Sequence, residues 1–379
     1  MATVVLAIVL ALILGFAAHR ASICTVRAVA EVMTPRHGST FVNVDPSMLW
    51  VWKAAWFLSS RRASMFASVG RSVLWVWALT LPVYWLMPSA GSGIVGWQLS
   101  GMAMLGGLSF GLGAALNGGC AYSTMARLVD GDGRMLAAIA GFAGGVFVFT
   151  ALAGWELLAR PTPAPALIAT ALPWFGLLAI PMLLWALYEA VRLWRSRDRS
   201  MRLVDLLLAA RYRLSTAALL IGLPGALLFL LFGPFGYTAT FELVIEGAFG
   251  TRPWPPTMRW VLLIAVLCGM LASTVQRGSF RIDWRPRREW LLNAAGGALM
   301  GFGTALAPGG NDALVLYGIP IVSPYALPTY AALAVGVAIG LMLMRCLFGI
   351  VARVETRNDT FITDTWTRPW TRPLPPARS

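Results

Sequence analysis

Long apolar segments alternate with short basic or glycine-rich segments along almost the whole chain. Each apolar segment is close to the roughly 20 residues that an α-helix needs to cross a bilayer. No basic residues precede the first segment, so we expect it to be a membrane helix and not a signal peptide. The pattern predicts an all-α polytopic membrane protein with about nine transmembrane helices, at residues 2–18, 72–88, 97–117, 135–155, 167–190, 214–233, 259–275, 290–307 and 328–350.

Two regions do not fit a membrane span. Residues 28–71 mix tryptophans with basic residues around an apolar core too short to cross, which predicts an amphipathic helix at the membrane interface. A half-crossing helix near residues 42–70 is the alternative for this region. The proline-rich end of the chain carries few apolar residues, which predicts a flexible C-terminal tail over residues 354–379.

The apolar pattern breaks twice at glycine-rich turns, at residues 117–120 (NGGC) and 308–311 (PGGN). Lipid cannot satisfy free backbone N–H and C=O groups, so a broken helix at membrane depth must be buried in protein or line a water-filled cavity. We therefore expect re-entrant or broken-helix loops at the centre of the protein. These loops are the first candidates for lining a pore or a substrate site.

Matched glycines precede the two breaks: positions 107, 111 and 113 correspond in spacing to positions 297, 301 and 303. Small residues four apart also let helices pack backbone to backbone, which is the simpler explanation for any single pair. Their repetition before two broken turns predicts one transport domain built from two related halves. The first half would be residues 1–155 and the second residues 259–353, with connecting spans and a basic loop at 156–258.

A shorter match aligns Arg20 and Ser22 with Arg277 and Ser279, each pair following a span. The nine-span topology places both pairs on one side of the membrane, but it makes the two glycine-rich helices run in opposite directions. An inverted repeat requires both features to be reversed, so one predicted boundary, in the segment near residues 42–70, is inconsistent with such a repeat.

Composition excludes a soluble protein, because 58% of residues are hydrophobic and only 12% are charged, against about a quarter in soluble domains. The net charge of +14 comes almost wholly from arginines, which cluster at 192–213 and 277–288 between apolar segments. This is the pattern of the positive-inside rule and not of a nucleic-acid surface. It predicts a bacterial inner-membrane protein with both loops and the C-terminus in the cytoplasm and the N-terminus in the periplasm.

The chemistry of the spans is sparse. The four cysteines form no CxxC pair and only two histidines accompany them, so neither a zinc or iron–sulfur site nor another cofactor is expected. Carboxylates lie at the ends of spans, except Asp312 beside the second broken turn. Proton-driven transporters usually carry intramembrane acids, so this scarcity favours a facilitated pathway, or a form of coupling that the sequence does not reveal.

Glycine-flanked turns at helix ends expose N–H groups and the positive end of a helix dipole, which suits anions. Arg20, Arg27 and Arg127 lie near these turns, although anchoring to lipid headgroups is an equally simple role for them. A thiol at such a turn can meet a soft atom of a ligand, whereas a thiol within an apolar helix is usually a small hydrophobic group. This argument separates Cys24 and Cys120 from Cys268 and Cys346.

These motifs resemble those of the YeeE/YedE family of sulfur-compound transporters, best known for thiosulfate uptake. The resemblance rests on three stretches, residues 20–27 (RASICTVR), residues 111–120 (GLGAALNGGC) and residues 301–311 (GFGTALAPGGN). It implies an hourglass-shaped protein in which loop cysteines pass thiosulfate by transient contacts with its terminal sulfur. Cys24 and Cys120 match the first two such cysteines. Asn311, after an inserted Pro308, stands at the place of the third.

We predict a transporter, not an enzyme, that moves a small sulfur-containing anion inward, and the lipid bilayer and a soluble sulfur-accepting protein on the cytoplasmic side are its expected partners. The alternatives are a carrier of another soft anion or oxyanion selected by Asn311, and a membrane sulfurtransferase with a cysteine persulfide. The predicted pathway residues are Cys24, Cys120, Asn311, Gly118, Gly119, Gly309, Gly310, Arg20, Ser22 and Thr25.

Overall fold

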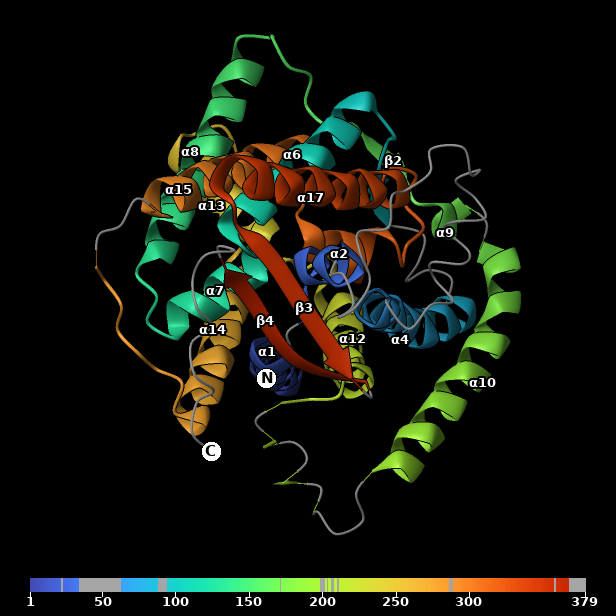
Figure 1. The fold of residues 1–379 in the computed structure, drawn as a ribbon. Coiled ribbons are helices and arrows are strands. Elements are labelled where there is room, and N and C mark those ends of the chain that lie inside the picture. The colour runs from blue at the N-terminus through green and yellow to red at the C-terminus, as the bar shows by residue number, and fades with distance from the viewer. Residues whose placement is uncertain are drawn as a thin grey trace, which may run out of the picture.

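The computed structural model describes residues 1–21, 23–33, 63–87, 94–170, 172–197, 202, 204–205, 208–209, 211–285, 289–357 and 359–367. Apolar sequence forms long helices here, as expected for backbone that must satisfy its own hydrogen bonds in lipid. They are α1 (Ala2–Ala21), α4 (Ser64–Leu86), α6 (Gly101–Asn117), α8 (Arg134–Gly154), α10 (Leu172–Ser196), α12 (Leu214–Phe232), α14 (Thr257–Arg277), α15 (Glu289–Leu306) and α17 (Ala326–Phe348) (Figure 1).

The predicted all-α membrane class is confirmed, but the predicted count of nine spans is not. Within the described residues, seven helices are long and apolar enough to cross a membrane, or eight if α15 and the bent segment after it form one span. α6 has only 17 residues. At about 1.5 Å per residue it is shorter than the roughly 30 Å hydrocarbon core.

Four short helices follow breaks in the long ones, so the predicted broken helices are confirmed. They are α2 (Thr25–Met33), α7 (Ala121–Val129), α13 (Tyr237–Ala248) and α16 (Asn311–Ala313), the last of which continues as the π-helical turn η1 (Leu314–Gly318). The axis bends by 44° between α15 and the α16–η1 segment. The two predicted breaks lie after α6 and α15, and two further breaks lie after α1 and α12.

Loop contacts define two opposite faces of the helix bundle. On the first, which we call the arginine face, Arg20 at the end of α1 donates to the carbonyl of Ala209, and Gln276 at the end of α14 donates to that of Leu208. On the opposite face, the short strands β1 (Val95–Trp97) and β2 (Pro163–Pro165) pair antiparallel near Ser323. The basic segments around residues 208–213 and 277 therefore lie on the same face.

The matched glycines are helix contacts. A Cβ atom added at Gly107 or Gly111 of α6 would lie 2.4 or 2.0 Å from a carbonyl oxygen of α17, and one added at Gly297 or Gly301 of α15 would lie 1.9 or 2.0 Å from a carbonyl oxygen of α8. Only glycine allows these backbones to approach so closely. The simpler explanation of the repeated glycines, helix packing, is thus correct for all four positions.

The long helices pack in two groups of four with the same arrangement of contacts. α6 packs on α17, α15 packs on α8, and α6 and α15 pack on each other; in the same way α1 packs on α14, α12 packs on α4, and α1 and α12 pack on each other. In this arrangement α12 corresponds to α1, because these two helices form the central pair of their group as α6 and α15 do in the other. The two related halves stay a prediction. Arg20 and Arg277, which the short sequence match aligns, lie on helices α1 and α14 that contact each other on one face.

Two predicted boundaries differ from the structure. α4 begins at Ser64, so the interfacial segment ends earlier than predicted; most of it, residues 34–62, lies outside the described residues. The predicted tail begins as an antiparallel hairpin of β3 (Val351–Arg357) and β4 (Thr360–Thr367), which crosses α2 on the arginine face (Figure 1). The hairpin forms because it alternates apolar and polar residues, whereas residues 368–379 lie outside the described part.

Candidate functional site

The N-terminal ends of the short helices meet at the centre of the bundle. α2 and α7 end near the arginine face, where the carbonyl of Asp130 accepts from the N–H of Arg281, while α13 ends near the opposite face, where Glu246 pairs with Arg160. The first residues of α2, α7, α13 and α16 contact one another in the middle of the bundle. Helix N-termini carry unsatisfied N–H groups and a partial positive charge, so this centre favours an anion.

The two predicted thiols touch each other at this centre. Cys24 directly precedes α2 and Cys120 is the N-cap residue of α7, and both are buried. The backbone N–H of Cys120 donates to the Sγ atom of Cys24 over 3.4 Å. By contrast, Cys268 on α14 and Cys346 on α17 are exposed on the outside of the bundle.

Asn311 also lies at this centre, next to the two cysteines. Its amide oxygen accepts a hydrogen bond of 2.7 Å from the hydroxyl of Thr25, the residue after Cys24. The same hydroxyl lies 3.1 Å from the phenolic oxygen of Tyr330 on α17. Four predicted pathway residues, Cys24, Thr25, Cys120 and Asn311, are therefore brought together from three separate breaks.

Glycine is required at two positions in these turns. Gly118 ends α6 with φ of 74°, and Gly309 has φ of 91°, both in the left-handed region that residues with a side chain rarely adopt. The N–H groups of the next glycines are hydrogen-bonded: that of Gly119 donates back to the carbonyl of Ala114 in α6, and that of Gly310 donates to the hydroxyl of Thr238 over 3.1 Å. The glycines therefore shape the turns.

A carboxylate lies beside Asn311. Asp312 is only 4% exposed and accepts hydrogen bonds from the hydroxyl of Thr238 and, over 3.4 Å, from its backbone N–H. The rings of Tyr122 and Tyr237 meet edge to face next to these residues, with centroids 4.4 Å apart. The centre thus combines thiols, an amide, hydroxyls and one acid.

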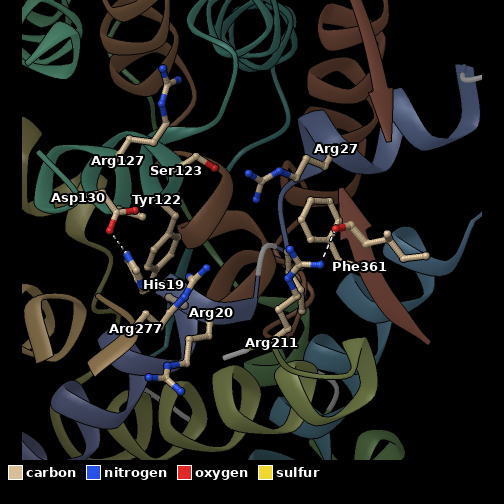
Figure 2. Close-up of a pocket in the computed structure, with 14 residues that line it drawn as sticks. His19, Arg20, Arg27, Tyr122, Ser123, Arg127, Asp130, Arg211, Arg277 and Phe361 are labelled. Atoms are coloured by element: carbon tan, nitrogen blue, oxygen red, sulfur yellow. Dashed lines mark hydrogen bonds and ion pairs between the residues drawn. The ribbon is translucent and has the colours of Figure 1, made fainter. Parts of the chain in front are cut away.

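A basic cavity of about 280 Å³ reaches these loops from the arginine face. Its lining includes Ile23, which directly precedes Cys24, and Tyr122 and Ser123 in the first turn of α7 after Cys120. Figure 2 shows arginines on several sides of the cavity, with Asp130 beside His19. The charged residues of the wall are five arginines and one aspartate, Arg20, Arg27, Arg127, Arg211, Arg277 and Asp130.

Asp130 is held in this wall by hydrogen bonds from several side chains. Its Oδ1 atom accepts from the hydroxyl of Ser279 over 2.6 Å and lies 3.1 Å from Nε2 of His19. Burial alone would raise the pKa of Asp130, but the hydrogen bonds of His19, Ser279 and Thr274 outweigh it, so the pKa is lowered. The carboxylate therefore stays charged, with its oxygen engaged in these hydrogen bonds. The five arginines leave the wall with a net positive charge, which attracts anions.

The predicted arginines have different places. Arg20 is buried at the edge of the cavity, where it donates to Ser273 over 2.8 Å and to the carbonyl of Ala209. Arg127 bridges the carbonyl of Asn117 and the carboxylate of Asp132. Neither has a contact with the thiols among these hydrogen bonds, so they belong to the cavity and not to the centre. Ser22 lies outside the described residues.

Sequence analysis missed Tyr330, Thr238 and the third short helix. Tyr330 was a polar aromatic residue within an apolar span, which is a weak signal. The segment 233–236 (GPFG) before α13 is a stronger one, because it is a glycine- and proline-rich interruption between apolar segments, like the two that were recognised. Among the described residues, no three His, Cys, Asp or Glu side chains gather as a metal site would need.

Comparison with known proteins adds one finding. A model of a family described as sulphur transport matches residues 52–339, which include Cys120 and Asn311 but not Cys24. A search of the curated proteins found no match.

Proposed function

The chain belongs to the sulphur transport (YeeE/YedE) family and is a multi-pass membrane transporter of a sulfur compound. We propose that it carries a small sulfur-containing anion, thiosulfate or a close relative, inward through its centre. One observation supports the central route above all others. The thiols of Cys24 and Cys120 meet where the N-termini of the short helices converge.

Each part of this centre suits one end of such an anion. The oxygens of a sulfonate-type group accept hydrogen bonds, which N–H groups at helix ends and the amide of Asn311 supply. The terminal sulfur of thiosulfate is soft and polarizable, as is a thiol. The basic cavity on the arginine face holds the anion near the bundle by charge, on the side where it leaves toward the cytoplasm.

The remaining elements of the proposal follow from the same premise. The protein lies in the bacterial inner membrane with the arginine face in the cytoplasm, the N-terminus in the periplasm and the C-terminus in the cytoplasm. A soluble protein that accepts sulfur from the released anion is a further proposed partner on the cytoplasmic side.

A second candidate function, sulfur transfer, is favoured by the contact of the Cys120 N–H with the Cys24 sulfur, since an N–H donor stabilises a thiolate or persulfide. In this reaction the Cys24 thiolate attacks the outer sulfur of thiosulfate. A bond forms between the two sulfurs, the sulfur–sulfur bond of thiosulfate breaks, and sulfite leaves with the electron pair.

Uptake by proteoliposomes tests the proposal. Purified protein should take up labelled thiosulfate or a related anion from a panel of sulfite, sulfate, thiosulfate and tetrathionate, and Cys120→Ala should abolish the uptake. Intact-protein mass spectrometry after exposure to thiosulfate separates the two functions. A stable added sulfur on a cysteine without uptake supports sulfur transfer, whereas uptake without an added sulfur supports transport.

A further inference from the structure

We propose that Asp312 is a proton-binding residue of this transporter and that each anion crosses the membrane together with a proton carried there. The inference rests on the proposed central route. It replaces the facilitated pathway that the scarcity of acids favoured, because the structure places this one acid at the site itself.

Asp312 directly follows Asn311, whose amide oxygen accepts from Thr25 beside Cys24. Both of its carboxylate oxygens face Thr238, which donates its hydroxyl proton to one and lies within 3.4 Å of the other through its N–H. The Thr238 oxygen in turn accepts from the N–H of Gly310. These hydrogen bonds meet at the consecutive residues Gly310, Asn311 and Asp312, so an anion at the thiols would lie close to a charge on Asp312.

Within the described part of the chain, the surroundings of Asp312 contain hydroxyl groups and no cation paired with it. Among the ion pairs of the described residues, none includes Asp312, whereas the buried Glu246 pairs with Arg160 and Arg252. The titratable groups that face Asp312 are phenols from the elements around it: Tyr122 of α7, Tyr237 of α13, Tyr317 of η1 and Tyr325 before α17.

A carboxylate buried without a cation gains much by binding a proton, since burial penalises its charged form. An acid within the membrane is costly and typically marks a proton or ion pathway. A bound anion nearby adds repulsion that favours the protonated acid. By thermodynamic reciprocity, the protonated acid then favours the bound anion by the same factor.

Glu31 of α2 provides a matched control. It is also buried, accepts from the backbone N–H of Met65 over 2.9 Å and from the hydroxyls of Ser64 and Thr356, and lies beside the C-terminal hairpin on the arginine face, away from the thiols. Glu31→Gln therefore removes a similarly buried and hydrogen-bonded carboxylate without touching the proposed pathway.

The experiment uses thiosulfate and proteoliposomes whose membrane potential is held at zero with valinomycin and equal potassium on both sides. With the outside one pH unit more acidic, the wild type should accumulate thiosulfate about tenfold for each coupled proton, because one pH unit is a tenfold ratio of proton activity. Asp312→Asn should lose this accumulation, while exchange of labelled for unlabelled thiosulfate persists. Glu31→Gln should behave like the wild type.

Three outcomes would overturn the inference: wild-type exchange without accumulation in the pH gradient, accumulation that Asp312→Asn retains, or an equal loss in both variants. A pH-sensitive dye inside wild-type vesicles gives a test that needs no variant. Addition of thiosulfate should acidify the interior, and a constant internal pH during uptake would exclude proton coupling. Absence of wild-type exchange would instead overturn thiosulfate as the substrate, which is part of the proposed function and not of this inference.

Discussion

The hydroxyl of Thr25 donates a hydrogen bond of 2.7 Å to the amide oxygen of Asn311, across 286 positions of sequence. A threonine hydroxyl has one proton, and an amide oxygen can only accept. The phenol of Tyr330, 3.1 Å from the Thr25 oxygen, must therefore be the donor in that contact. The relay from Tyr330 through Thr25 fixes the amide of Asn311 and leaves its two N–H donors for a ligand oxygen.

Asn311→Ala should weaken uptake of the native substrate, because it removes donors to an anion that has left water. The loss of such a hydrogen bond costs about 1–3 kcal/mol, which corresponds to an increase of about 5- to 150-fold in KM. Asn311→Cys should raise thiosulfate uptake by restoring a soft contact at the break after α15. Both effects are measured as KM and maximal rate in proteoliposomes.

Tyr330→Phe is the control for the orientation of the amide. If Tyr330 acts through Asn311, its substitution should raise KM in the wild type but have no further effect in Asn311→Ala protein. Additive effects would separate the two residues. Full thiosulfate uptake by the wild type, unchanged by both Asn311 substitutions, would mean that Asn311 only forms the turn.

Cys120→Ala should abolish transport, whereas Cys268→Ala and Cys346→Ala should leave it unchanged. Cys120 contacts Cys24 at the centre, and the other two thiols are exposed on the outside of the bundle. Substitutions at exposed positions usually change stability by no more than about 0.5 kcal/mol. Uptake per folded molecule is the measurement, and equal defects in all three variants would show that packing and not substrate contact explains the thiols.

Residues 191–213 and 277–289 should face the cytoplasm. Arginines fill both segments, and the structure joins them on one face, where Gln276 donates to the carbonyl of Leu208. Reporter fusions inserted in each segment should be active only in their cytoplasmic form. If both fusions report a periplasmic location, the direction of transport proposed for the arginine face is reversed.

Sequence reasoning located the breaks after α6 and α15 because glycine pairs interrupt apolar sequence there, and it selected Cys24 and Cys120 from four cysteines by their position at turns. The contact between Thr25 and Asn311 could not be predicted, since it depends on how the breaks approach in space. The role of Tyr330 could not be predicted either, because nothing in the sequence of an apolar span shows which polar residue faces the centre.

Two other features were visible in part. The alternation of apolar and polar residues in 351–367 predicts strands, but the proline-rich composition of the whole tail outweighed it in the sequence argument. The break before α13 has the same glycine content as the other two, but its glycines are not adjacent and α12 before it lacks the glycine spacing shared by α6 and α15. Local patterns of single residues therefore carried more information than the average composition of a segment.

The last prediction concerns the contact between α8 and α15, which holds the second broken helix in place. A Cβ atom at Gly301 would lie 2.0 Å from the carbonyl oxygen of Phe142, and reciprocally one at Gly145 would lie 2.0 Å from that of Ala298. Backbone cannot yield as a flexible side chain does, so Gly301→Ala should destabilise the protein at the upper end of the usual overpacking cost of about 1–3 kcal/mol.

Gly144→Ala is the matched control, since Gly144 lies on α8 next to Gly145 but a Cβ atom there has no neighbour within 4 Å. The added methyl group replaces glycine with a better helix former, so this variant should be as stable as the wild type or gain up to about 1 kcal/mol. Thermal unfolding in detergent, followed by size-exclusion chromatography, measures both. If Gly301→Ala and Gly144→Ala unfold at the same temperature, the close approach of α8 and α15 at Gly301 is wrong. The glycines matched by spacing would then need another explanation.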